Sequence, residues 1–242
     1  MKKHLSVLML HARSTIYKLL AALVFMTATE AVLFYMTVRR LQGTTLMGLE
    51  YAFAEGKIVW AFCAAFVLFC AVLLRSGYEF GSKQGYTLRR LRVSEEAVFI
   101  WQAVYNTVCL FILWAFQLLV VMGLSMWYMS VAGEAASGGQ TIFLAFYRDE
   151  FLHSLMPLAE GSRLARNLIL VPCLGTALAA LPWRQRRGQK GIAGILLPAV
   201  AVVSFKGEMG LFAVDAIVSM AAIVMAGSAA LGVLWKELRD ED

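Results

Sequence analysis

The strongest constraint on this chain is a stretch of 36 residues, 97–132, that contains no charged side chain. As one α-helix it would be about 54 Å long, whereas about 20 apolar residues suffice to cross the hydrocarbon core of a bilayer. Its middle offers Gly123 as the only turn residue, without Pro or Asn beside it, so the pattern favours one long tilted helix. Trp101 and Trp127 would lie about 39 Å apart along this helix, which fits two interfacial aromatic belts.

The composition excludes a soluble globular protein. Of the 242 residues, 60% are hydrophobic and 16% are charged, whereas soluble domains are about 25% charged. Apolar runs near the length of a membrane span recur along the chain. We therefore predict an all-α polytopic membrane protein with six transmembrane helices, over residues 19–38, 58–74, 97–132, 167–183, 191–205 and 211–235.

The basic residues predict the orientation of the spans. With six spans and the N-terminus in the cytoplasm, 15 of the 22 Lys and Arg residues fall in inside segments, as the positive-inside rule requires for an N-in, C-in protein. The net charge of +6 is thereby explained without nucleic-acid binding. Residues 1–18 mix apolar and basic side chains, which predicts an amphipathic elbow helix along the inner membrane surface. Residues 19–242 would form the membrane domain.

The first predicted cytoplasmic loop, residues 75–96, carries a short apolar and basic segment. Between Gly85 and Ser94 there is room for about two helical turns. Ser94 suits the N-cap of the long third span, and Glu95 and Glu96 suit its first turn, where carboxylates meet exposed N–H groups. The side chains that this short helix would present are Tyr86, Leu88, Arg89, Arg90, Leu91 and Arg92.

This order of elements resembles the permease subunits of ABC-2-type ABC transporters. The shared features are a basic N-terminal amphipathic helix, two spans, a cytoplasmic loop with a small arginine-bearing helix, a long third span and three further spans. The run from Gly85 to Ser94 is similar to the segment of that family that docks into a cleft on the ATPase subunit. Only residues 206–210 would connect spans five and six, so the chain lacks room for the re-entrant hairpin that many members carry there.

The resemblance implies a transport function that depends on partners. The chain contains no Gly-x-x-x-x-Gly-Lys-Ser/Thr phosphate loop, so it would not be an enzyme itself, and ATP and Mg would be bound by a separate ABC ATPase subunit. Two permease subunits, identical or homologous, would pair in the bacterial cytoplasmic membrane and act as an exporter. Coupling to the ATPase would fall on Tyr86, Leu88, Arg89, Arg90, Leu91 and Arg92.

Polar residues inside the predicted spans are the other candidate functional groups. A charge in the centre of a bilayer costs several kcal/mol, so such residues face protein or water. They form either a lining for a substrate or gate, or interhelical hydrogen bonds that fix packing. The residues are Glu30 in the first span, Gln102, Asn106 and Gln117 close to one face of the third, and Asp215 in the sixth.

The remaining segments carry weaker signals. Residues 133–166 predict an outer-surface helix. His153 lies near Asp149 and Glu150 there, but a single histidine beside carboxylates indicates a solvated face rather than a metal site. All four cysteines fall in apolar runs and are interpreted as small buried hydrophobes.

Three other functions stay open from the sequence. A stand-alone secondary carrier would be expected to show internal repeats, and none is visible between the two halves. A non-transporting membrane scaffold is a second alternative. An intramembrane hydrolase is the remote one, because neither Glu95 and Glu96 nor Ser228 has the partner residues that catalysis requires.

Overall fold

A computed structural model describes residues 2–41, 48–76, 94–132, 140–158, 160–186, 188–207 and 212–234, with side chains from residue 6 onward. Helices make up 92% of this described part, and no strand occurs in it. Five helices are long and apolar enough to cross a membrane, which indicates a multi-pass membrane protein. The prediction of an all-helical membrane fold is therefore confirmed.

Helix α1 (Lys2–Leu41) is continuous over 40 residues. The boundary predicted at residue 18 lies inside it, so the elbow segment and the first span form one helix. A single buried face explains this continuity, because buried residues recur every three or four positions along its length. These residues are Val7, His11, Thr15, Leu19, Ala22, Met26, Glu30, Phe34 and Val38.

The next three helices confirm two predictions and add one element. Helix α2 (Leu49–Glu55) is a short amphipathic turn, with Leu49, Ala52 and Phe53 buried, that the sequence analysis did not predict. Helix α3 (Ile58–Ser76) matches the second predicted span. Helix α5 (Glu95–Ala132) is the single long helix predicted from the charge-free stretch, and Ser94 precedes it with its Oγ 3.4 Å from the backbone nitrogen of Ala97.

The surface helix predicted within residues 133–166 is confirmed in part, because a largely exposed helix lies at 141–148. In the described part of this segment the chain forms two short helices, α6 (Thr141–Arg148) and α7 (Glu150–Leu155), and residues from Gly161 onward already belong to α8. The break between α6 and α7 lies at Asp149, which has extended backbone angles and caps α7. Most of α7 is buried, because it packs against α6 and α9.

Helix α8 (Gly161–Arg186) starts six residues before the predicted fourth span and continues through Pro172 and Pro182. Helix α9 (Ala193–Lys206) has 14 residues, about 21 Å, and is too short to count among the five candidate spans. Helix α10 (Phe212–Leu234) matches the sixth predicted span. The structure therefore supports five helices of membrane-spanning length, and the predicted sixth crossing would fall on α9.

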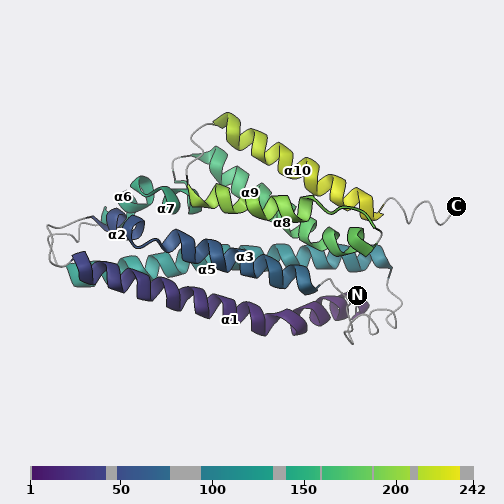
Figure 1. The fold of residues 1–242 in the computed structure, drawn as a ribbon, viewed down its shortest axis with the longest axis horizontal. Helices are drawn as coiled ribbons and strands as arrows, with labels where there is room; N and C mark the ends of the chain where they lie inside the picture. Colours follow the sequence, from purple (N-terminus) through teal and green to yellow (C-terminus); the bar gives the residue numbers. More distant parts are fainter. Residues whose placement is uncertain are drawn as a thin grey trace.

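The helices form an elongated bundle in which α5 is central (Figure 1). Helix α5 packs against α1 on one side and α8 on the other, while α3 packs mainly on α1 and α10 mainly on α8. The short helices α2, α6 and α7 gather at one end, and α1 begins and α10 ends at the other (Figure 1). The two described termini therefore lie at the same end of the bundle.

The outer surface of the bundle is apolar. On α1, α5 and α10, large hydrophobic side chains are strongly exposed, for example 69% at Phe25, 69% at Leu119 and 76% at Phe212. A monomeric soluble protein rarely exposes apolar patches on this scale. These helix faces therefore suit contact with lipid.

Candidate functional site: polar side chains within the bundle

The two acidic residues predicted inside spans have different partners. Glu30 on α1 is fully buried and accepts a hydrogen bond from Gln117 Nε2 on α5 at 3.0 Å. Gln117 is also fully buried. This contact joins residues 87 positions apart in the chain and ties α1 to α5 in the apolar part of the bundle.

Asp215 on α10 forms a buried ion pair with Arg166 on α8. Arg166 Nη1 lies 2.7 Å from Asp215 Oδ1, and the two residues are 1% and 4% exposed. Ser162 Oγ donates to the second carboxylate oxygen at 3.3 Å. A buried charge is tolerated when it is paired and hydrogen-bonded in this way.

The ion pair belongs to a network that joins α7, α8, α9 and α10. Arg166 also donates to Asn167 Oδ1 at 3.1 and 3.3 Å and to the Ser204 carbonyl of α9 at 3.3 Å. Asn167 Nδ2 donates to the Ser154 carbonyl of α7 at 2.8 Å, and Ser154 Oγ donates to the Phe205 carbonyl at 2.6 Å. This role of Arg166 was not predicted, because the residue directly precedes the fourth predicted span, 167–183. A pattern in the sequence could have indicated this pair. A basic residue, Arg166, lies near the start of one span, and an acidic residue, Asp215, lies near the start of the next long span.

The other predicted polar residues of α5 are buried as well. Asn106 is fully buried and donates to the Gly175 carbonyl at 3.3 Å, and Gln102 is 1% exposed. At Gly175 the two helices approach so closely that a Cβ would lie 2.3 Å from Thr107 Oγ1. All five predicted intramembrane residues are therefore buried. Glu30 and Gln117 bond across the α1–α5 contact, Asn106 across α5–α8 and Asp215 across α8–α10, so they do not share one set of partners.

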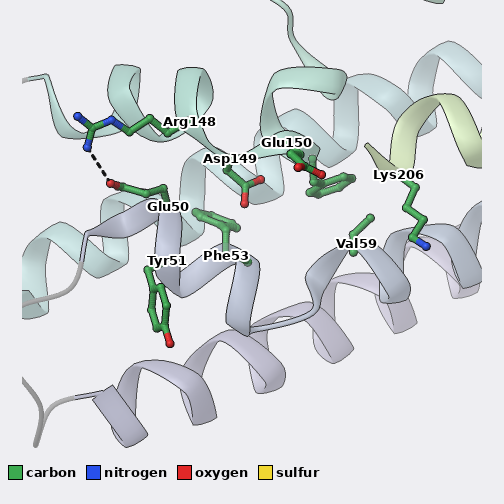
Figure 2. Close-up of a pocket in the computed structure, with 10 residues that line it drawn as sticks. Glu50, Tyr51, Phe53, Val59, Arg148, Asp149, Glu150 and Lys206 are labelled. Carbon is green, nitrogen blue, oxygen red and sulfur yellow. Dashed lines mark hydrogen bonds and ion pairs between the residues drawn. The ribbon is translucent and has the colours of Figure 1, made fainter. Parts of the chain in front are cut away.

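A pocket of about 490 Å³ lies at the end of the bundle that carries α2, α6 and α7. Figure 2 shows the Asp149 carboxylate pointing toward Phe53, with Glu50 and Arg148 on one side and Lys206 on the other. Glu50 pairs with Arg148 at 3.2 Å, and Lys206 Nζ lies 4.4 Å from the centre of the Trp60 ring. The lining residues are Glu50, Tyr51, Phe53, Ala54, Val59, Arg148, Asp149, Glu150, Phe151 and Lys206.

Asp149 is the buried acid of this pocket, with 8% of its surface exposed. Burial raises the pKa of its carboxyl above the ordinary value, and hydrogen bonds from the backbone of Leu152 and Phe151 oppose that rise. The bond from the Leu152 nitrogen, at 2.9 Å, is the N-cap of α7. The Asp149 side chain therefore caps α7 at the wall of the pocket.

The prediction that His153 lies on a solvated face is wrong. Its side chain is 4% exposed, with Nδ1 3.3 Å from the Phe146 carbonyl and its ring edge-on to Tyr147. Within the described ranges, no three His, Cys, Asp or Glu side chains are placed to hold a metal ion. Three of the cysteines are buried and Cys173 is partly buried, as predicted for small apolar residues, and all four are free thiols.

The predicted ATPase-coupling residues Tyr86, Leu88, Arg89, Arg90, Leu91 and Arg92 lie outside the described residues. Their attachment points are described. Helix α3 ends at Ser76 and α5 begins at Glu95, at the same end of the bundle as the start of α1 (Figure 1).

No protein-family model, curated protein or solved structure matches this chain.

Proposed function

We propose that this chain is the transmembrane permease subunit of an ATP-driven ABC transporter, in which separate ATPase subunits supply the energy. The observation that carries the proposal is the position of α5. This helix begins at Glu95, directly after the basic segment 85–93, and packs along both α1 and α8. A force applied to that segment would enter a helix that contacts both halves of the bundle.

The packing of α5 supports such a coupling function. Its first turns contact α1 through Tyr105, whose hydroxyl lies 2.6 Å from Thr15 Oγ1, and α8 through Asn106. A rigid helix transmits displacement when both of its neighbours are closely packed against it. Movement at the start of α5 would therefore change the contacts of α1 and α8 together.

The proposal includes six crossings with both termini in the cytoplasm of a bacterial cell, and two permease chains per transporter. Helix α9 supplies the sixth crossing, because it runs antiparallel to α8. Gly191 and Gly194 lie against Leu181 near the end of α8, whereas Ser204 contacts Arg166 near its start. The shortness of α9 is compatible with a position covered by α3, α7, α8 and α10.

Charge reversal in the basic segment tests the proposal. The full chain is purified in mild detergent from its native membrane, and ATP hydrolysis by the complex is measured together with the mass of copurifying chains. We expect a phosphate-loop ATPase to copurify with the unmodified chain. We expect the triple variant Arg89→Glu, Arg90→Glu, Arg92→Glu to lose most of that association, because the three positive charges of the docking segment become negative.

The matched control is the double variant Arg39→Glu, Arg40→Glu. These two exposed residues lie in the last turn of α1, at the end of the bundle away from the basic segment. This control should retain the ATPase. Equal loss in both variants, or undiminished association after charge reversal at 89, 90 and 92, would contradict the docking function. Transport by the purified chain alone, driven by an ion gradient without ATP, would instead favour a secondary carrier.

A further inference from the structure

Glu30 has an incomplete set of hydrogen bonds. Its Oε2 accepts from Gln117 Nε2, but its Oε1 is buried without a partner. Gln117 Oε1, on the same amide that donates to Glu30, is a second buried oxygen without a donor. The pair therefore presents two buried acceptor atoms, and one additional donor is needed to satisfy them.

No cation among the described residues supplies that donor. Helix α1 packs against α2, α3 and α5, and the nearest bases on α1 itself, Lys18 and Arg39, lie about 18 and 13 Å away along the helix. Arg75 in the last turn of α3 is the sole base on these three neighbouring helices. Their other titratable groups are Glu50, Tyr51, Glu55, Cys63, Cys70, Glu95, Glu96, Tyr105, Cys109 and Tyr128.

The contrast with Asp215 is direct. Asp215 is buried to a similar degree, but it faces the Arg166 guanidinium and the Ser162 hydroxyl, so its carboxylate is fully compensated. Glu30 faces a neutral amide in an apolar surrounding. A lone carboxylate is costly in such a place, whereas a carboxylic acid can donate its proton in a hydrogen bond.

We propose that Glu30 and Gln117 form a proton-binding site between α1 and α5, in which a proton on the Glu30 carboxyl supplies the missing donor. With the proton bound, the pair is neutral and holds the two helices together. Loss of the proton leaves a carboxylate with one neutral partner, which weakens the contact. Separation of α1 from α5 is thereby linked to proton release at this position, independently of any ATPase partner.

Neutral amide substitutions at the two buried acids test this site. Glu30→Gln resembles the protonated acid, so we expect the full chain in lipid nanodiscs to keep its Tm within about 2 °C at pH 7. Asp215→Asn breaks a buried ion pair and strands Arg166, so we expect its Tm to fall by roughly 10 °C. Infrared spectra at pH 7 should show a protonated-carboxyl stretching band that Glu30→Gln removes and Asp215→Asn retains.

Two results would overturn the proposal. One is an infrared band that Glu30→Gln leaves unchanged, or a Glu30→Gln protein that is destabilised as much as Asp215→Asn. The other is a sodium-specific rise in Tm. In this result sodium chloride raises the Tm of the unmodified chain, choline chloride does not, and neither salt raises the Tm of Glu30→Gln. A metal cation would then fill the place of the proton. If Asp215→Asn does not accumulate, Glu55→Gln serves as the infrared control, because Glu55 is an exposed residue of α2. The protonated-carboxyl band must persist in that variant.

Discussion

Buried polar side chains in this protein find partners at three kinds of contact. Some are local, such as Ser125 Oγ, which donates to the carbonyl of Val121 one turn earlier. Some join neighbouring helices through neutral groups, as Thr15 and Tyr105 do at 2.6 Å. Others join opposite charges, as Arg166 and Asp215 do. In an apolar environment each arrangement removes the cost of an unsatisfied polar group.

Asp149 provides a residue-scale prediction. Asp149→Asn keeps an N-cap acceptor for α7 but removes a buried charge, so we expect a higher Tm than that of the unmodified chain at pH 7. The pKa of the Asp149 carboxyl is higher in the folded chain than in the unfolded chain, where it is about 3.9. The protonated acid therefore stabilises the fold fully below the unfolded pKa, and this stabilisation is lost as the pH rises through the folded pKa. The advantage of Asp149→Asn should therefore shrink as pH falls toward 4.

The control for this measurement is Asp149→Ala, which removes both the charge and the bond to the Leu152 nitrogen. Loss of an N-cap costs about 1 kcal/mol, so this variant should be less stable than Asp149→Asn at every pH in a thermal melt. If Asp149→Asn were less stable than the unmodified chain at pH 7, the hydrogen bonds to the carboxylate would outweigh its burial.

Tertiary packing determines how the individual helices begin, continue and end. Helix α8 continues through Pro172 and Pro182, although a proline inside a helix costs about 3 kcal/mol. Packing against α5, α9 and α10 buries most of its length and offsets that cost. Helix α1 continues past the predicted boundary because its buried face extends from Val7 to Val38.

The contact between α5 and α8 gives an element-scale prediction. Gly175→Ala places a Cβ 2.3 Å from Thr107 Oγ1 and 2.8 Å from its backbone nitrogen, so the helices must separate. Such overpacking costs about 1–3 kcal/mol, and we expect a lower Tm in detergent. Gly123→Ala is the matched control within α5, because no atom lies within 4 Å of its new Cβ. It should be neutral or slightly stabilising. Equal Tm values for the two variants would contradict the close approach.

The helices of the molecule differ widely in length. Helices α1 and α5, with 40 and 38 residues, are longer than a bilayer requires, whereas α9 has 14. The short helices α2, α6 and α7 meet the far end of the long ones (Figure 1). The polar network around Arg166 then fixes α10 and α9 to α8 near that same end.

The path of α9 gives a prediction for the whole molecule. In a chain whose four native cysteines are replaced by alanine, Lys190→Cys and Lys206→Cys place single thiols at exposed positions before α9 and at its end. A membrane-impermeant thiol reagent should label them from opposite sides if α9 completes a sixth crossing. Labelling of both from one side would place the two chain ends on opposite sides and would contradict the N-in, C-in arrangement.

The sequence by itself determined the class of fold and the positions of most long helices, because hydropathy and helix length are local properties that the bilayer selects directly. It also identified Glu30, Gln117 and Asp215 as polar residues in apolar surroundings. Tertiary structure alone decided their partners, which lie 87 positions apart for Glu30 and Gln117 and 49 for Arg166 and Asp215. Those pairings depend on which helix faces meet and at what depth, and no local pattern encodes that arrangement.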